Sequence, residues 1–196
     1  MRSLIFTLLL AIAVCFSSCQ KETITPVVTP ARIIPGPPAS SIGLNQTSGN
    51  VTITGYLRIQ MAKDATNTDN ILIDFKPGSE TAFNRSEDAP SLQGFGVVGL
   101  ASLSSDNVAL SINTMPLTAN GATIGLVVKA NASGAYQLNL LTVSSIPTTF
   151  GIWLKDGITK DSVDFRNNTS YPFNINKSDS TTFGSHRFSV VLRENN

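Results

Sequence analysis

The sequence predicts an all-β protein built as an antiparallel β-sandwich of about ten short strands. From residue 51 onward, apolar and polar residues alternate with a period of two, and turn residues separate the alternating runs. The runs recur about every 8 to 12 residues, a spacing typical of sandwiches and barrels. No run has the period of about 3.6 residues that marks an amphipathic helix, and the lack of helices between strands argues against a parallel sheet.

The first predicted strand, residues 51–60, shows the alternation most clearly. One face carries the apolar residues Val51, Ile53, Leu57 and Ile59, and the other carries Thr52, Thr54, Tyr56, Arg58 and Gln60. A strand with one apolar and one polar face is half-buried. The other predicted strands follow in chain order at 71–76, 95–103, 108–112, 123–130, 135–143, 150–155, 162–166, 171–175 and 187–193.

Residues suited to tight turns separate these strands. Examples are Ala119-Asn120-Gly121, Asn131-Ala132-Ser133-Gly134 and Lys155-Asp156-Gly157. Asn and Gly tolerate the positive φ that tight hairpins require, so each of these segments is predicted to reverse the chain.

The first residues of the chain predict a processed membrane anchor. The apolar run from Leu4 to Val14 is too short to span a bilayer, which needs about 20 residues. Phe16-Ser17-Ser18-Cys19 resembles a bacterial lipobox, in which small residues precede a cysteine that is cleaved and diacylated. We therefore expect residues 1–18 to be a lipoprotein signal peptide and Cys19 to carry the lipid.

The remaining chain divides into a tether and a domain. Residues 19–45 are rich in proline and threonine and show no sustained periodicity, which predicts a lipidated, extended tether. A polyproline-like chain advances about 3.1 Å per residue, so this tether would hold the domain away from the membrane. Residues 46–196 are predicted to form the β-sandwich domain.

Composition excludes several classes of protein. Of the 14 basic residues, only Arg2 lies in the signal peptide, which leaves 13 basic and 13 acidic side chains in the mature chain. A neutral chain with scattered basic residues has no footprint for nucleic acid, so we expect no nucleic-acid partner. Once Cys15 is removed with the signal peptide and Cys19 is acylated, no disulfide is expected. We also expect no cofactor.

Several motifs of the C-terminal half form one pattern. A strand ends in Asp156, an aspartate-containing hairpin follows, and then come the Tyr171-Pro172-Phe173 strand and a final strand with Arg187-Phe188. With Asp88-Ala89, and over about residues 83–193, this pattern resembles a β-sandwich module of Bacteroidetes surface proteins. In that family the module commonly precedes a type IX secretion sorting tail. Only Glu194-Asn195-Asn196 follow the last strand here, so we expect the lipid anchor to replace the tail.

The residues after the lipidated cysteine bear on location. Gln20, Lys21 and Glu22 are similar to the short signal by which some lipoproteins of this phylum are sent to the outer face. We therefore expect a lipid anchor in the outer membrane, with cell-surface display favoured over a periplasm-facing position. This location implies a glycan or another envelope protein as the partner.

The aromatic residues supply candidates for ligand binding. Trp153 is predicted to point away from the apolar face of strand 150–155. An exposed indole could stack on sugar rings, with Tyr56 or Tyr171 as companions. Packing of Trp153 beneath a neighbouring loop is the alternative that the sequence favours.

An oxygen-rich loop offers the candidate metal ligands. Asp64 and Asp69 lie close to Asn67 and Asn70 in sequence, and calcium prefers six to eight oxygen ligands. The spacing lacks the glycine and the glutamate of an EF-hand, and Asp and Asn are ordinary turn residues. Turn formation is therefore favoured over a metal site.

Two short motifs suggest covalent modification. Asp161-Ser162-Val163 and Asp179-Ser180-Thr181 resemble the acceptor of periplasmic O-glycosylation in the same phylum. This resemblance makes Ser162 and Ser180 candidate glycosylation sites.

No catalytic constellation stands out. His186 is the only histidine, which leaves no second histidine for a zinc site, and no Gly-x-Ser-x-Gly nucleophile elbow occurs. No pair of carboxylates is selected by spacing for glycoside cleavage. We therefore expect a non-enzymatic cell-surface lipoprotein that acts as an adhesion or glycan-binding module. The alternative is a structural or assembly component of the cell envelope, such as a fimbria-like or partner-binding subunit.

Overall fold

β-Strands account for nearly all regular structure in the computed structural model, which describes residues 53–92 and 96–195. The one helical element within these ranges is the three-residue 3₁₀-helix η1 (Ser180–Thr182). The all-β prediction is therefore confirmed. No helix in this part of the chain is long and apolar enough to cross a membrane.

The strands follow the predicted alternation closely. In chain order they are β1 (Gly55–Ala62), β2 (Thr68–Phe75), β3 (Ala89–Pro90), β4 (Val98–Leu103), β5 (Ala109–Met115), β6 (Ala122–Ala130), β7 (Gly134–Ser144), β8 (Phe150–Asp156), β9 (Ser162–Asp164), β10 (Ser170–Ile175) and β11 (Gly184–Glu194). Each predicted strand is present, with ends that differ by a few residues. β3 was not predicted, because two residues cannot display a period.

β1 begins later than predicted, at Gly55. Ile53 instead forms an isolated antiparallel bridge with Leu117, and its N–H donates to the Leu117 carbonyl at 3.2 Å. Gly55 lies so close to a neighbouring strand that a Cβ atom would be 2.4 Å from the Ser144 carbonyl oxygen. The chain therefore changes partners at this glycine.

The strands form one continuous sheet in the order β10-β7-β1-β2-β5-β4-β6-β11-β8-β9, with β3 paired to β5 off this path. Every pairing is antiparallel except that of β2 with β5, which is parallel. The expectation of purely antiparallel pairing is wrong for this pair. A parallel connection needs a long crossover, and here β3 and β4 lie in that crossover instead of a helix.

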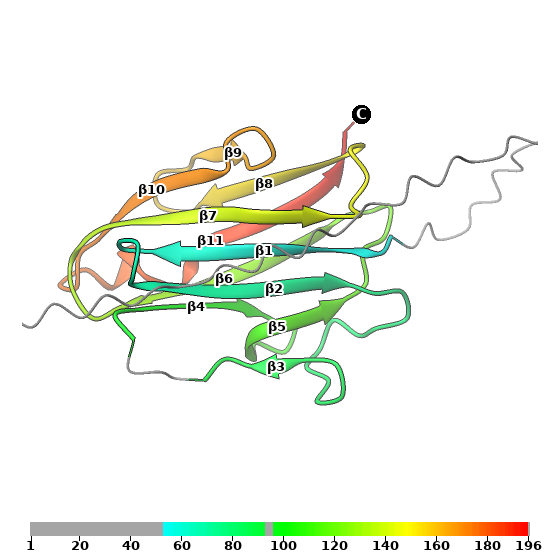
Figure 1. The fold of residues 1–196 in the computed structure, drawn as a ribbon, viewed down its shortest axis with the longest axis horizontal. Coiled ribbons are helices and arrows are strands. Elements are labelled where there is room, and N and C mark those ends of the chain that lie inside the picture. Colours follow the sequence, from blue (N-terminus) through cyan, green and yellow to red (C-terminus); the bar gives the residue numbers. More distant parts are fainter. Residues whose placement is uncertain (1–52, 93–95, 196) are drawn as a thin grey trace, which may run out of the picture. The chain divides into compact units, whose positions relative to one another are not determined.

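The sheet curls until its two ends, β10 and β9, approach each other. After β9, the N–H of Phe165 donates to the Ile152 carbonyl on β8 at 2.8 Å. A few residues later, the Thr169 carbonyl accepts from the Leu140 N–H on β7, also at 2.8 Å. The segment between β9 and β10 thus bridges β8 and β7, and the sheet becomes nearly barrel-shaped. Figure 1 shows β7, β1 and β2 in front of β6, β8 and β11. Two separate sheets, as in the predicted sandwich, are not confirmed.

Apolar side chains from both halves of the curled sheet fill its interior. On β1, Leu57, Ile59 and Met61 are fully buried, whereas Tyr56 and Arg58 are exposed, so the predicted division of faces is confirmed. Burial of one large apolar side chain contributes about 1.5–3 kcal/mol. The largest fully buried side chains are Phe75, Tyr136, Phe165, Leu57, Ile59, Met61, Ile71, Ile73, Leu100, Leu110, Leu117 and Ile124.

Candidate functional site

The outer face of β10, β7, β1 and β2 carries side-chain amides in register. Gln60 on β1 lies opposite Asn70 on β2 and Asn139 on β7, and Asn139 lies opposite Ser170 on β10. The Asn139 Nδ2 donates to Gln60 Oε1 at 3.2 Å, and the Ser170 hydroxyl donates to Asn139 Oδ1 at 2.8 Å. We call Asn70, Gln60, Asn139 and Ser170 the amide row. The row joins strands that are far apart in sequence into one polar surface.

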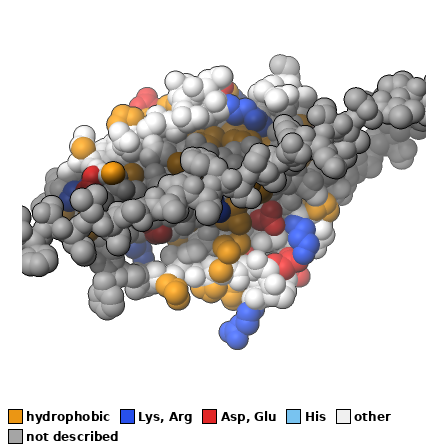
Figure 2. Space-filling view, viewed as in Figure 1, with side chains coloured by type: hydrophobic (Ala, Val, Ile, Leu, Met, Phe, Trp, Pro, Cys, Tyr) orange, Lys and Arg blue, Asp and Glu red, His pale blue; other side chains and the backbone are white. Residues whose placement is uncertain are grey.

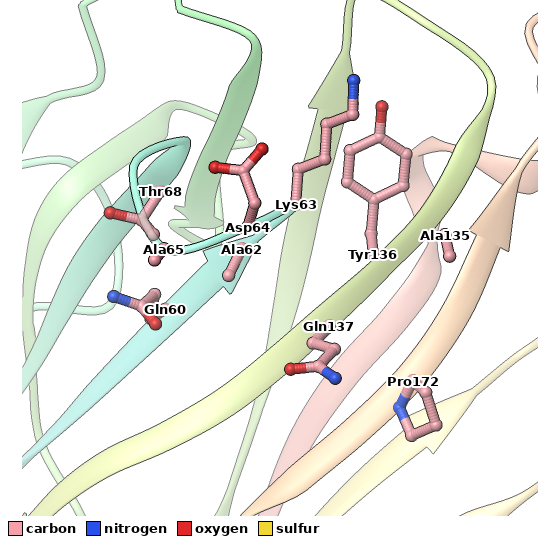
Figure 3. A pocket seen from close by; sticks show the side chains of 10 residues that line it. All are labelled: Gln60, Ala62, Lys63, Asp64, Ala65, Thr68, Ala135, Tyr136, Gln137 and Pro172. Carbon is pink, nitrogen blue, oxygen red and sulfur yellow. The ribbon is translucent and has the colours of Figure 1, made fainter.

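A groove of about 510 Å³ adjoins the amide row. Its lining residues come from the four strands β1, β2, β7 and β10 and from the turn between β1 and β2: Gln60, Ala62, Lys63, Asp64, Ala65, Thr68, Ala135, Tyr136, Gln137 and Pro172 (Figure 3). The alanines at 62 and 135 leave room between the longer side chains, and Gln60 belongs to both the groove and the row. The groove is therefore open, shallow and largely uncharged.

The one carboxylate of the groove is engaged by its own turn. Asp64 Oδ1 accepts hydrogen bonds from the N–H groups of Thr66 at 3.0 Å and Asn67 at 2.9 Å, and Oδ2 accepts from the Asn67 amide at 2.7 Å. These hydrogen bonds hold the pKa of Asp64 well below its usual range, and those from Asn67 make the largest contribution. Asp64 therefore stabilises the turn. Among the described residues visible in Figure 2, a few basic and acidic side chains are scattered between apolar and uncharged polar ones.

Asp69 has a different structural role. Its Oδ2 accepts the N–H of Leu100 on β4 at 2.8 Å, and its Oδ1 accepts the N–H of Asn70 at 2.9 Å. Asp64 and Asp69 thus bind different parts of the backbone. Within residues 53–92 and 96–195, no three His, Cys, Asp or Glu side chains gather as a metal site would require.

Trp153 lies on the outer face of the other half of the sheet. On β8 the neighbours Ile152 and Leu154 are buried, and Trp153 points the opposite way and is half-buried, as the alternation predicts. It lies opposite Val191 on β11 and Asp164 on β9. The ring is thus flanked by aliphatic and polar residues, without a second aromatic in register.

The other two aromatic candidates lie elsewhere. Tyr56 is on the outer face of β1 and is 36% exposed. Tyr171 on β10 packs against the core, with its ring edge-on to Phe188 at 6.0 Å between centroids. The structure therefore does not bring Trp153, Tyr56 and Tyr171 together into one platform.

A buried ion pair lies close to Tyr171, and the sequence did not predict it. The Arg187 guanidinium bonds Asp156 Oδ2 through Nη2 at 3.0 Å and through Nε at 3.2 Å. Nη1 of Arg187 donates to the carbonyls of Asn174 and Thr182, each at 2.7 Å. Burial alone would raise the pKa of Asp156, but the hydrogen bonds and charge of Arg187 outweigh it, and the pKa is lowered.

Aromatic rings complete the surroundings of this pair. The guanidinium carbon of Arg187 lies 4.9 Å from the Phe173 ring centre and 4.7 Å from that of Phe188. The Tyr171 hydroxyl is 3.3 Å from Oδ2 of Asp156 and 3.3 Å from Oδ2 of Asp161. Burial makes the largest contribution to raising the pKa of Tyr171, and the negative charges of Asp156 and Asp161 raise it further. Three of the motifs that carried the family resemblance, Asp156, Tyr171-Pro172-Phe173 and Arg187-Phe188, thus meet here in a cluster that stabilises the fold. Asp88-Ala89 lies elsewhere, at β3, where Asp88 accepts the N–H of Thr114 on β5.

The remaining candidates are on the surface or outside the described residues. Ser162 is exposed on β9 and Ser180 is exposed in η1. Asp179, next to Ser180, accepts the Thr181 N–H at 3.0 Å and so caps η1. Cys19, Gln20, Lys21 and Glu22 lie outside the described residues.

Comparisons with protein-family models, with curated proteins and with solved structures found no match to this chain. A function therefore has to be inferred from the chemistry of these surfaces.

Proposed function

We propose that this chain is a non-enzymatic, surface-anchored lipoprotein whose β-domain binds glycans as an adhesion module. The observation that carries the proposal is the amide row with its adjoining groove. Side-chain amides both donate and accept hydrogen bonds, as sugar hydroxyls do, and a groove whose only charged residues are one lysine and one aspartate, Lys63 and Asp64, suits a neutral glycan. The register that aligns Gln60 with Asn139 also fixes the spacing of these groups before any ligand binds.

The shape of the domain supports the same use. We propose that the curled sheet is flattened into the two-layer sandwich that the sequence predicts, with β10, β7, β1 and β2 as one layer. A flattened layer presents a broad, shallow face, and the acylated Cys19 with the tether at 19–45 would hold that face away from the membrane. In the same proposal, the module belongs with the Bacteroidetes surface proteins that its C-terminal motifs resemble.

The groove offers no acid–base pair for catalysis. Lys63 and Asp64 are its titratable residues apart from the Tyr136 phenol, and Asp64 accepts hydrogen bonds from its own turn. The Tyr136 hydroxyl donates to the Ala132 carbonyl at 2.7 Å, and burial raises its pKa. Binding without chemistry is therefore the function that we propose.

The edges of the sheet do not favour assembly by strand addition. β9 has three residues, and short edge strands are poor templates for pairing. On β10, Pro172 lacks an N–H, and the Asn174 carbonyl accepts from Arg187. The assembly alternative therefore lacks a supporting observation among the described strands.

Glycan binding by the purified full-length lipoprotein in a nonionic detergent tests the proposal. A glycan array followed by calorimetry on the best neutral ligand should show binding that Gln60→Ala weakens about tenfold, the value of one lost hydrogen bond. Asn131→Ala, which removes an exposed amide outside the row, serves as the matched control and should bind like the wild type. Equal affinity of the Gln60→Ala and wild-type proteins would reject the amide row as the site.

A further inference from the structure

The outer face on β8 and β11 carries an aromatic side chain between two cations. Trp153 and Lys155 are two residues apart on β8, so both side chains point outward. Arg193 on β11 lies opposite Gly151, and its guanidinium carbon is 5.1 Å from the centre of the Trp153 ring. We call Trp153, Lys155 and Arg193 the Trp153 patch. It lies on the opposite half of the sheet from the amide row.

Neither cation of the patch forms an ion pair with the described protein around it. The ion pairs between described residues are Lys76–Glu87 and Arg187–Asp156, so neither cation of the patch has a carboxylate partner there. Asp164, which faces Trp153 from β9, accepts the Arg166 N–H at 2.9 Å and the Asn167 amide at 2.7 Å. The Asp164 carboxylate is therefore oriented by its own turn but keeps its negative charge, and Lys155, Arg193 and Asp164 together carry one net positive charge.

The indole N–H has no acceptor. Nε1 of Trp153 is buried, and it is the one buried side-chain nitrogen or oxygen without a partner among the described residues. The ring can lie against the strand because Gly151 has no side chain: a Cβ there would be 2.6 Å from Nε1 and 2.7 Å from Asn195 Oδ1. Buried donors are normally satisfied. Displacement of the exposed Asn195 side chain would open this donor to an oxygen of a ligand.

We propose that the Trp153 patch is a second binding site, specific for a carboxylated polysaccharide. A sugar ring stacks on the part of the indole that the Arg193 guanidinium leaves uncovered, and its carboxylates pair with Arg193 on one side and Lys155 on the other. Lys155 is two residues after Trp153 on β8, and Arg193 lies opposite Gly151, two residues before it. Residues two apart on a strand are separated by about 7 Å, so the two cations lie on opposite sides of Trp153 along the strand. The cation–π contact with Trp153 holds the Arg193 guanidinium in place before the ligand arrives.

A linear acidic glycan fits these observations because it combines the two chemistries of the patch. Its ring faces supply apolar area for the indole, and its carboxylates recur along one line, as the cations do. The uncharged amide row lacks both features. The proposal goes beyond the neutral-glycan site, because it assigns a different ligand class to a different face.

The single tryptophan of the chain makes the test direct, because its fluorescence, excited selectively over the three tyrosines, reports on this site alone. The full-length lipoprotein in nonionic detergent is titrated with galacturonate oligomers at low salt, and dextran oligomers of equal length serve as the neutral control. We expect a saturable change in emission with the acidic oligomers alone. Lys155→Gln combined with Arg193→Gln should weaken the affinity at least tenfold, and added salt should weaken wild-type binding.

Three results would overturn the proposal. They are no saturable change with galacturonate oligomers, an equal change with dextran, or wild-type affinity in the double variant. A change with anionic vesicles but none with the oligomers would also reject a glycan ligand. Gln60→Ala should leave galacturonate binding unchanged, and its effect on the neutral glycan is measured separately. Failure at one face is thereby distinguished from failure at the other.

Discussion

A single guanidinium connects several elements where the two ends of the sheet meet. Arg187, on β11, bonds Asp156 at the end of β8, the Asn174 carbonyl on β10 and the Thr182 carbonyl of η1. The side chains of Arg187 and Asp156 are 5% and 0% exposed, so solvent screens this pair little. The Arg187–Asp156 pair therefore contributes to the stability of the junction between the two ends of the sheet.

Replacement of Arg187 should be strongly destabilising. Arg187→Ala leaves the buried Asp156 carboxylate without its cation and removes the Arg187 donor from two carbonyls, and breaking a buried ion pair typically costs about 3–5 kcal/mol. Arg187→Lys keeps the charge but loses the planar guanidinium that donates several hydrogen bonds at once. Its free energy of unfolding should therefore lie between those of the wild type and Arg187→Ala. Urea unfolding measures both, and Arg193→Gln on the outer face serves as the control. A loss below about 1 kcal/mol for Arg187→Ala would show that the pair contributes little.

The same pair predicts a response to acid. The pKa of Asp156 is below its ordinary value of 3.8 in the folded protein. Its contribution to stability is therefore fully present above the unfolded pKa and is lost as the pH falls through the lower, folded pKa. Asp156→Asn should be much less stable than the wild type at pH 7, and the difference should narrow at acidic pH. Unfolding free energies across this range check the sign, and a constant difference would contradict it.

At the scale of elements, strands could be predicted from alternation and turns from Asn and Gly, because both signals are local. The position of β5 between β2 and β4 could not, because strand pairing depends on residues far apart in the chain. The outward direction of Trp153 was likewise predictable from its strand. The amide row was not, because Gln60 and Asn139 are 79 residues apart and each looks like an ordinary surface amide.

The turn between β5 and β6 yields a prediction for an element. Gly121 has φ +80°, and a Cβ there would lie 2.1 Å from the Leu192 carbonyl oxygen on β11. Gly121→Ala should therefore cost more than the 1–3 kcal/mol or so of backbone strain, because β11 must also shift. Gly78 has nearly the same φ, +81°, with nothing within 4 Å of its Cβ position, so Gly78→Ala isolates the strain alone. If Gly121→Ala and Gly78→Ala lose equal stability in thermal or urea unfolding, the clash with the Leu192 carbonyl contributes nothing.

At the scale of the whole molecule, the proposed role depends on where the domain faces. A glycan-binding surface acts on outside ligands only if the acylated chain is displayed outward. The proposed binding surfaces lie within the described residues, whereas the proposed signals for location, Cys19 and residues 20–22, lie outside them. Location is therefore a separate prediction with its own test.

Protease treatment and antibody labelling of intact cells test this display. The wild-type domain should be labelled and cleaved. Cys19→Ala should release it from the membrane, and Lys21→Ala with Glu22→Ala should reduce labelling while membrane attachment remains. Protection of the wild-type domain in intact cells would place it on the periplasmic side and exclude a role in surface adhesion.

The place of β11 in the sheet constrains how the domain can fold. The last strand in sequence lies between β6 and β8, so a chain that lacks it has two disconnected pieces of sheet. The pairings of β1 with β7 and of β6 with β11 also join distant segments, and such topologies fold in about milliseconds to seconds. The sheet thus cannot be completed before β11 has been synthesised. If the protein is exported as we propose, translocation can begin while the sheet is still incomplete.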